Sequence, residues 1–170
     1  MLKYKIATFQ IPNVSLYIEI DFQKNLMEGS KKLFLLDAYA LIYRGYYAFI
    51  KNPRINSKGT DTSAILGFMN SLLEIIRTQN PDYIAVAFDK GGSITRSEMF
   101  TEYKSNRDKT PEPIIIAITY IKDILTAMKI PILEKEGYEA DDVIGTVAKD
   151  AEKNSFKVFM VTPDKDFAQL

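Results

Sequence analysis

The stretch Lys31 to Asp37, KKLFLLD, decides the fold, and it is followed at once by AYALIYRGYYAF. The apolar run Leu33 to Leu36 predicts a short buried strand. The segment after it predicts a helix. A buried strand that passes directly into a helix is typical of α/β domains with a parallel sheet. The strand also ends in a carboxylate, Asp37, which bears on function.

The alternation of strand and helix continues along the chain. A second β-rich run is YIAVAFD, from Tyr83 to Asp89, a short strand and turn lie in KIPILEKEGY, and a last strand lies in FKVFMVTPDKD. Three helices with apolar stripes are predicted between the strands. The stripes are Ile65, Met69, Leu72 and Ile76 after a cap at Thr62 or Ser63; Ile114, Ile118, Ile121, Leu125 and Met128 after a start near Pro113; and Val143, Val147, Ala148 and Ala151. Because the connections allow right-handed crossovers, we expect a parallel sheet with helices on both faces.

Residues 1–30 differ from the rest of the chain. They have weak periodicity, end in the polar QKNLMEGS, and contain a second methionine, Met27, before the first clear element. We interpret them as an atypical N-terminal extension from an added or mis-started N-terminus. The alternative is an extra edge strand within VSLYIEI. Residues 31–170 then form one domain.

Composition excludes several kinds of chemistry. The 170 residues are 46% hydrophobic, and no apolar run approaches the roughly 20 residues of a membrane span. With no secretory signal pattern, we expect a soluble cytoplasmic protein. The chain has no cysteine and no histidine, which excludes thiolate chemistry, Ser-His or Cys-His triads and His-ligated zinc. An enzyme with this composition would use carboxylates, Lys, Tyr or water, and oxygen ligands suit Mg²⁺ or Mn²⁺.

Acidic residues gather where the predicted strands end. The stretch YEADDVIG, Tyr138 to Gly145, places three carboxylates at the start of a helix, and the strands end in four more. The seven are Asp37, Asp89, Glu139, Asp141, Asp142, Asp164 and Asp166. In an open parallel sheet the carboxyl ends of the strands form the ligand crevice. We therefore expect the seven to converge on one edge of the sheet.

Each acidic motif also has a purely structural explanation. Acids near a helix N-terminus complement its dipole, and an Asp after a strand is common in turns. Seven converging carboxylates without a counter-cation would nevertheless destabilise the fold by several kcal/mol. Two divalent cations, about 3.5–4 Å apart, would relieve the repulsion and suit in-line displacement at phosphorus.

Basic and aromatic residues indicate a nucleic-acid partner. The chain has 22 basic and 22 acidic residues, so setting the seven acids aside leaves 15 acidic against 22 basic. Between Asp89 and Pro113 five cations are interleaved with two aromatics: Lys90, Arg96, Lys104, Arg107 and Lys109, with Phe100 and Tyr103. This pattern suits a phosphate backbone with stacked bases, although it also suits a solvated loop. Tyr43 and Arg44 lie close enough to Asp37 to touch a substrate, whereas most tyrosines of YRGYY are expected to pack.

Four motifs, in order, resemble the N-terminal 5′-nuclease domain of bacterial DNA polymerase I, which belongs to the flap endonuclease superfamily. They are FLLDAYALIYRGYYAF, VAFDKGGSITRSEMFTEYKSNRDKTPE, EGYEADDVIGTVA and VFMVTPDKDFAQL, and the resemblance covers about Lys31 to Leu170. It implies a PIN-like three-layer α/β fold with a mostly parallel central sheet and helices on both faces. It also implies a helical arch from Lys90 to Thr110, through which a single-stranded 5′ end passes.

The resemblance implies a role for each motif residue. Asp37, Asp89 and Glu139 would bind the first metal ion. Asp141 would lie between the two ions with Asp142 in support, and Asp164 and Asp166 would hold the second. The residues that would grip the scissile phosphate are Arg96, Lys104 and Arg107. Tyr43 would stack on the terminal base and Arg44 would contact a phosphate, while Lys104, Arg107 and Asp141 would be catalytic.

The implied activity is hydrolysis of DNA phosphodiester bonds at 5′ ends or 5′ flaps, for primer removal and repair. The expected cofactors are two Mg²⁺ or Mn²⁺ ions, and the expected partner of this monomer is DNA with a 5′ end or flap, or an RNA primer. The sequence stops at Leu170, before the family's further aspartates, its duplex-gripping helical element and the polymerase domain. We therefore expect a C-terminally truncated domain, and the alternative is a DNA-binding remnant that holds flaps without cutting.

Two other phosphoryl-transfer folds fit less well. A haloacid-dehalogenase-type phosphotransferase needs a second Asp two residues after the first strand's Asp, and that position is Tyr39. A response-regulator receiver needs an acidic pair at the end of the first strand, whereas the pair here, Asp141 and Asp142, is on a late helix.

Overall fold

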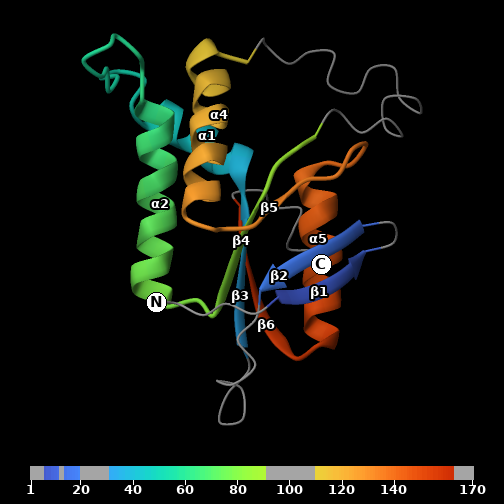
Figure 1. The fold of residues 1–170 in the computed structure, drawn as a ribbon. Coiled ribbons are helices and arrows are strands. Elements are labelled where there is room, and N and C mark those ends of the chain that lie inside the picture. Colours follow the sequence, from blue (N-terminus) through green and yellow to red (C-terminus); the bar gives the residue numbers. More distant parts are fainter. Residues whose placement is uncertain (1–5, 12–13, 20–30, 91–109, 163–170) are drawn as a thin grey trace.

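The computed structural model of the chain describes residues 6–11, 14–19, 31–90 and 110–162. Its central sheet has four strands in the order β5-β4-β3-β6, and all neighbours in it are parallel. The strands are β3 (Lys31–Asp37), β4 (Tyr83–Ala87), β5 (Ile132–Leu133) and β6 (Phe156–Val161). The predicted parallel sheet is therefore confirmed (Figure 1).

Helices lie on both faces of this sheet, as the strand pattern predicts. They are α1 (Ala38–Ala48), α2 (Ser63–Gln79), α4 (Glu112–Ala127) and α5 (Ala140–Lys153). Phe34 and Leu36 of β3 belong to the core that contains α1, α2 and α4, whereas Leu33 and Leu35 belong to the core that contains α5. Because successive side chains of a strand point to opposite faces, one apolar run supplies both cores.

The order in which the chain forms the strands determines where a ligand site can lie. From β3 the chain passes to β4 and then β5 on one side, and it later returns to β6 on the other side of β3. In open parallel sheets, the crevice at the carboxyl ends of the strands, where the strand order reverses, is the usual ligand site. Asp37, the last residue of β3, stands at this point.

The buried side of α2 differs from the predicted stripe. The apolar side chains of α2 with almost no exposure are Ala64, Phe68 and Leu72. From the predicted stripe, Leu72 is buried, while Ile65, Met69 and Ile76 lie at the margin of the core and are partly buried. Thr62 is the N-cap residue, as expected, but its side chain makes no capping hydrogen bond, because its hydroxyl donates to the Arg54 carbonyl at 2.7 Å. The Ser63 N–H donates to Asp61 Oδ1 at 2.8 Å.

The stripes of the two later helices are close to those predicted. In α4, Ile114, Ile121 and Leu125 are buried and Ile118 is partly buried, whereas Met128, the C-cap residue, is 39% exposed. In α5 the whole predicted stripe is buried, namely Val143, Val147, Ala148 and Ala151. Period-3.6 patterns in these two segments therefore located the packed faces correctly.

An antiparallel hairpin precedes the domain. Strands β1 (Ile6–Ile11) and β2 (Val14–Glu19) pair with each other in a separate two-stranded sheet, and β1 contacts α5 (Figure 1). A strand does form within VSLYIEI, but it is not an edge strand of the main sheet. In the part of the chain that the structure describes, there is no helix with the length and apolar character needed to cross a membrane.

Two glycines allow α1 and α2 to approach closely. A Cβ built on Gly67 would lie 2.3 Å from the Cα of Gly45, and one built on Gly45 would lie 3.0 Å from the Gly67 Cα and the Ala64 carbonyl oxygen. These neighbours are backbone atoms, which cannot rotate away as a flexible side chain can. The helix crossing therefore requires glycine at Gly67.

We predict that Gly67→Ala lowers the free energy of unfolding by about 1–3 kcal/mol, because the helices must separate to admit the methyl group. Alanine's higher helix propensity, worth up to about 1 kcal/mol, acts in the opposite direction and is the smaller effect. Urea unfolding followed by circular dichroism measures the change. The control is Asn70→Ala at an exposed position of α2, which should be neutral or slightly stabilising. A Gly67→Ala protein as stable as this control would show that the helices are not in close contact.

Candidate functional site

Asp37 connects three elements at the carboxyl edge of the sheet. It ends β3 and caps α1, where its Oδ1 accepts a hydrogen bond from the Ala40 N–H at 3.1 Å. Its Oδ2 accepts a hydrogen bond from the hydroxyl of Thr162, just after β6, at 3.3 Å. The carboxylate is therefore held in a fixed orientation between two neighbouring strand ends.

Asp89 connects β4 to the start of α5. Its Oδ1 accepts a hydrogen bond from the N–H of Ala140, the first residue of α5, at 2.6 Å. A charged acceptor at a helix N-terminus satisfies a backbone donor that has no partner within the helix, and it interacts favourably with the helix dipole. This bond brings the EADD motif to the same edge of the sheet as Asp37.

The acids of the EADD motif have structural roles in the first turn of α5. Glu139 is the N-cap and forms a capping box with Asp142, whose Oδ2 accepts from the Glu139 N–H at 3.2 Å. Asp141 Oδ1 accepts from the Asp142 N–H at 2.7 Å. Glu139 is only 8% exposed. The capping explanation of this motif is therefore correct, and it does not exclude metal binding, because each carboxylate has further lone pairs.

Electrostatics shows that acids from separate elements face one another. Burial raises the pKa of Asp37 most strongly, and hydrogen bonds from Ala40 and Thr162 partly oppose that effect. The charges of Asp89 and Asp141 raise this pKa further. The charges of Asp89, which follows β4, and of Asp141, in the first turn of α5, thus reach Asp37 at the end of β3.

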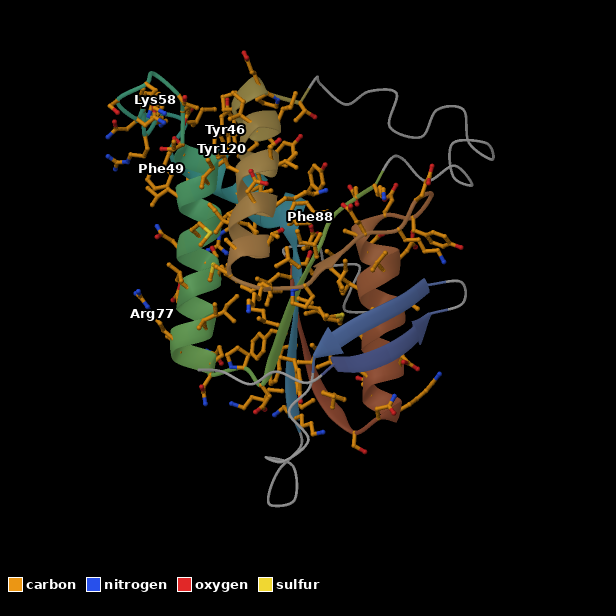
Figure 2. The ribbon with its side chains drawn as sticks, in the orientation of Figure 1. Tyr46, Phe49, Lys58, Arg77, Phe88 and Tyr120 are labelled. Carbon is orange, nitrogen blue, oxygen red and sulfur yellow. The ribbon has the colours of Figure 1, made fainter. Side chains whose placement is uncertain are left out.

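Phe88, which directly precedes Asp89 and is labelled in Figure 2, is fully buried. Its N–H donates to the Leu133 carbonyl at 2.8 Å, which extends the pairing beyond β4. The Lys122 ammonium lies 4.9 Å from the centre of its ring and pairs with Glu134 at 2.6 Å. Sequence patterns gave no signal for the Lys122–Glu134 pair. The Thr162 contact had a weak signal, a polar residue at the end of a strand.

The donor set fits a divalent cation that prefers oxygen. It consists of carboxylates that repel one another, and such charges need a cation to lie together at low cost. Within residues 31–90 and 110–162, however, no three acids are arranged to hold a metal ion as the side chains stand. Asp37 and Asp89 direct oxygens toward N–H and O–H donors instead. The metal ligands named from the sequence remain predictions.

Five of the predicted site residues lie outside the described ranges: Arg96, Lys104, Arg107, Asp164 and Asp166. The predicted arch falls almost wholly in residues 91–109, which the structure also leaves undescribed. Tyr43 is described, and its hydroxyl donates to Thr110 Oγ1 at 3.3 Å, which links α1 to the residue where the described chain resumes. Arg44 is exposed on α1.

The fold and the acidic edge define the class of this protein, an open parallel α/β domain with carboxylates at its topological switch point. A family model described as 5′-3′ exonuclease, N-terminal resolvase-like domain, matches residues 32–170, and the chain belongs to this family. A 5′-3′ exonuclease of Aquifex aeolicus is 41% identical over 140 residues, and DNA polymerase I of Bacillus subtilis is 41% identical over 145 residues. These alignments cover 82% and 85% of this chain, but 48% and 16% of the two relatives.

Solved structures confirm the fold. The bacteriophage T5 flap endonuclease in a complex with DNA and metal ions has a TM-score of 0.60 at 23% identity, covering 82% of this chain and 52% of that one. A T5 structure co-crystallised with metal ions has a TM-score of 0.57 at 22% identity, covering 81% and 50%. The expected PIN-like α/β fold is therefore confirmed. The chain spans about half the length, or less, of the curated relatives named above.

We predict that Asp89→Asn preserves or raises stability in EDTA, while it weakens metal binding. The amide removes a repelling charge but keeps an oxygen that can accept the Ala140 N–H. Asp89→Ala is the matched comparison, and it should cost about 1–3 kcal/mol because that donor loses its partner. Calorimetry with EDTA and with Mg²⁺ measures both effects. Clear destabilisation of Asp89→Asn in EDTA would contradict a repulsive cluster.

The raised pKa of Asp37 predicts a pH effect of known sign. Since the folded state holds this proton more tightly than the unfolded state, stability falls as pH rises from about 4 through the raised pKa. Asp37→Asn removes this dependence, so in EDTA the variant should gain stability over the wild type between about pH 4 and pH 7. Urea unfolding across that range measures the difference. Parallel stability profiles would show that Asp37 titrates normally.

Proposed function

We propose that this chain hydrolyses DNA phosphodiester bonds at 5′ ends or 5′ flaps in a reaction that depends on divalent metal ions. The observation that supports this most directly is that Asp37, Asp89 and Asp141 come from three elements at one edge of the sheet, close enough for the charges of Asp89 and Asp141 to raise the pKa of Asp37. Family membership and the T5 flap endonuclease complex with DNA and metal ions support the substrate class. In a longer protein of this family, the activity would serve primer removal and repair.

The acids would divide between two ions. Mg²⁺ or Mn²⁺, when bound, supplies an activated water and stabilises the developing charge at phosphorus. Asp37, Asp89 and Glu139 would hold one ion, with Asp141 between the two and Asp142 in support. Asp164 and Asp166 would hold the other. As the side chains stand, the oxygens of Asp37 and Asp89 accept hydrogen bonds from N–H and O–H donors, so binding an ion would use their remaining lone pairs or require these carboxylates to turn.

The cationic and aromatic residues would hold the DNA. Arg96, Lys104 and Arg107 would bind the scissile phosphate, and Arg44 would bind a neighbouring one. Tyr43 would stack on the terminal base. Its bond to Thr110 supports this placement, because it brings the ring to the end of the basic segment. The substrate would therefore lie between α1 and that segment, beside the carboxylates.

The test is a titration of Mg²⁺ and Mn²⁺ against a fluorescent 5′-flap duplex, with EDTA and the Asp141→Asn variant as controls. We expect cleavage that rises with metal, leaves a 5′-phosphate and is lost in both controls. Binding without cleavage at every metal concentration would instead support the DNA-binding remnant.

Lys104→Ala tests the predicted arch in the same assay. It should slow single-turnover cleavage by about tenfold or more, with little change in the melting temperature, because the lost interaction is with the phosphate. An unchanged rate would remove Lys104 from the mechanism while leaving the metal site untouched.

A further inference from the structure

We propose that Tyr39, Tyr43 and Tyr47 on α1 form a stacking track for single-stranded DNA that leads away from the carboxylates. The inference rests on the proposed function and extends it. The family resemblance selects Tyr43 alone, whereas Tyr39 and Tyr47 are assigned from the geometry of this helix.

The spacing of the three tyrosines places them on one side of α1. Residues four apart on a helix are neighbours on its surface, so the three rings follow one another along the axis. The rings of Tyr43 and Tyr47 are stacked, with centroids 6.3 Å apart and planes inclined by 29°. Tyr46 meets Tyr47 edge-on, with ring centroids 5.3 Å apart. Tyr39, Tyr43 and Tyr46 are partly buried and pack against the core, so Tyr47 is the most exposed of these rings. The rings of Tyr43 and Tyr47 thus form one aromatic surface.

The first ring places the start of this surface beside the carboxylates. Tyr39 meets the buried Phe88 edge-on, with centroids 6.3 Å apart, and Phe88 directly precedes Asp89. A strand that follows the track would therefore have its reacting phosphate near the acids.

Exposure and charge identify the occupant as a single nucleic-acid strand. Tyr47 is 56% exposed although it is a large ring, so its face is open to a ligand. Unpaired bases stack on aromatic rings in a sequence-tolerant way, whereas bases inside a duplex cannot. Between residues 38 and 73 the chain has four cations, Arg44, Lys51, Arg54 and Lys58, against one acid, Asp61.

Arg44 lies between Tyr43 and Tyr47, and the other three cations follow Tyr47 in the chain. All four are exposed, and the guanidinium of Arg54 lies 5.2 Å from the ring centre of Phe49, just past α1. Figure 2 shows Tyr46 and Phe49 on the side of the molecule that carries Lys58. Aromatic rings with cations nearby suit a single strand, whose bases can stack and whose phosphates are negatively charged.

The test uses the full chain in EDTA, where no cleavage is expected, and a single-stranded oligonucleotide with aminopurine near its 5′ end. Anisotropy reports binding, and quenching of the aminopurine reports stacking. Tyr47→Leu and Tyr39→Leu should each weaken binding by at least about fivefold and reduce the quenching. Tyr47→Phe and Tyr39→Phe keep the ring and should stay within about twofold of the wild type.

The matched control is Tyr120→Leu, which removes a tyrosine of similar exposure, 52%, from α4 and should change neither signal. The track is wrong if the wild type gives no quenching, if both Leu variants bind and quench as the wild type does, or if the Phe variants lose as much as the Leu variants. Melting temperatures show whether each variant is folded. Failure of metal-dependent cleavage would leave these binding results standing, so the two proposals fail separately.

Discussion

Like charges are held together at the carboxyl edge of the sheet, and fixed hydrogen-bond donors make this possible. Asp37 accepts from a backbone N–H of α1 and from the Thr162 hydroxyl, and Asp89 accepts from the first N–H of α5. Hydrogen bonds to an ionised acceptor are stronger than neutral ones, and each donor here is a group that the fold must satisfy in any case. The same bonds therefore orient the acids and join the strand ends to the helices. Burial and neighbouring charges still raise the pKa of Asp37, so the donors only partly relieve the repulsion.

The parts of this arrangement that follow from local patterns were predictable from the sequence. A short apolar run such as Leu33 to Leu36 fits a strand covered on both faces, and a parallel topology sends the carboxyl ends of such strands to one edge. The positions of Asp37 and Asp89 in the chain therefore fixed their positions in space. The period-3.6 stripe of α5 likewise identified its buried side, because most of its remaining positions are polar or charged, although Ala140, Ile144 and Gly145 beside the stripe are buried as well.

Where a local sequence pattern fits two buried faces of a helix, packing against the rest of the structure determines which face is buried. Helix α2 is apolar around much of its surface, so its periodicity fits adjacent stripes equally well, and the close approach of Gly67 to Gly45 selects the one through Ala64, Phe68 and Leu72. The contacts of Phe88 with Tyr39 and Lys122 join residues far apart in the chain, and no spacing rule predicts them. A strand within VSLYIEI was the alternative expectation for the N-terminal residues, but the pairing of β2 with β1 in a sheet of its own was not predicted.

The capping roles of Glu139 and Asp142 raise the question of whether the EADD motif also binds metal. A carboxylate that caps a helix uses one or two of about four acceptor positions, and the bond fixes its direction. An orienting bond of this kind is what a metal ligand requires from its surroundings, since ligands that are held in place lose little entropy when an ion binds. A motif that only capped α5 would need no further acids nearby, yet the first turn also carries Asp141, whose charge reaches Asp37 on another element. Capping explains why Glu139 and Asp142 begin the helix. It does not explain why Asp141 lies close to Asp37, and the proposed metal site would account for that arrangement.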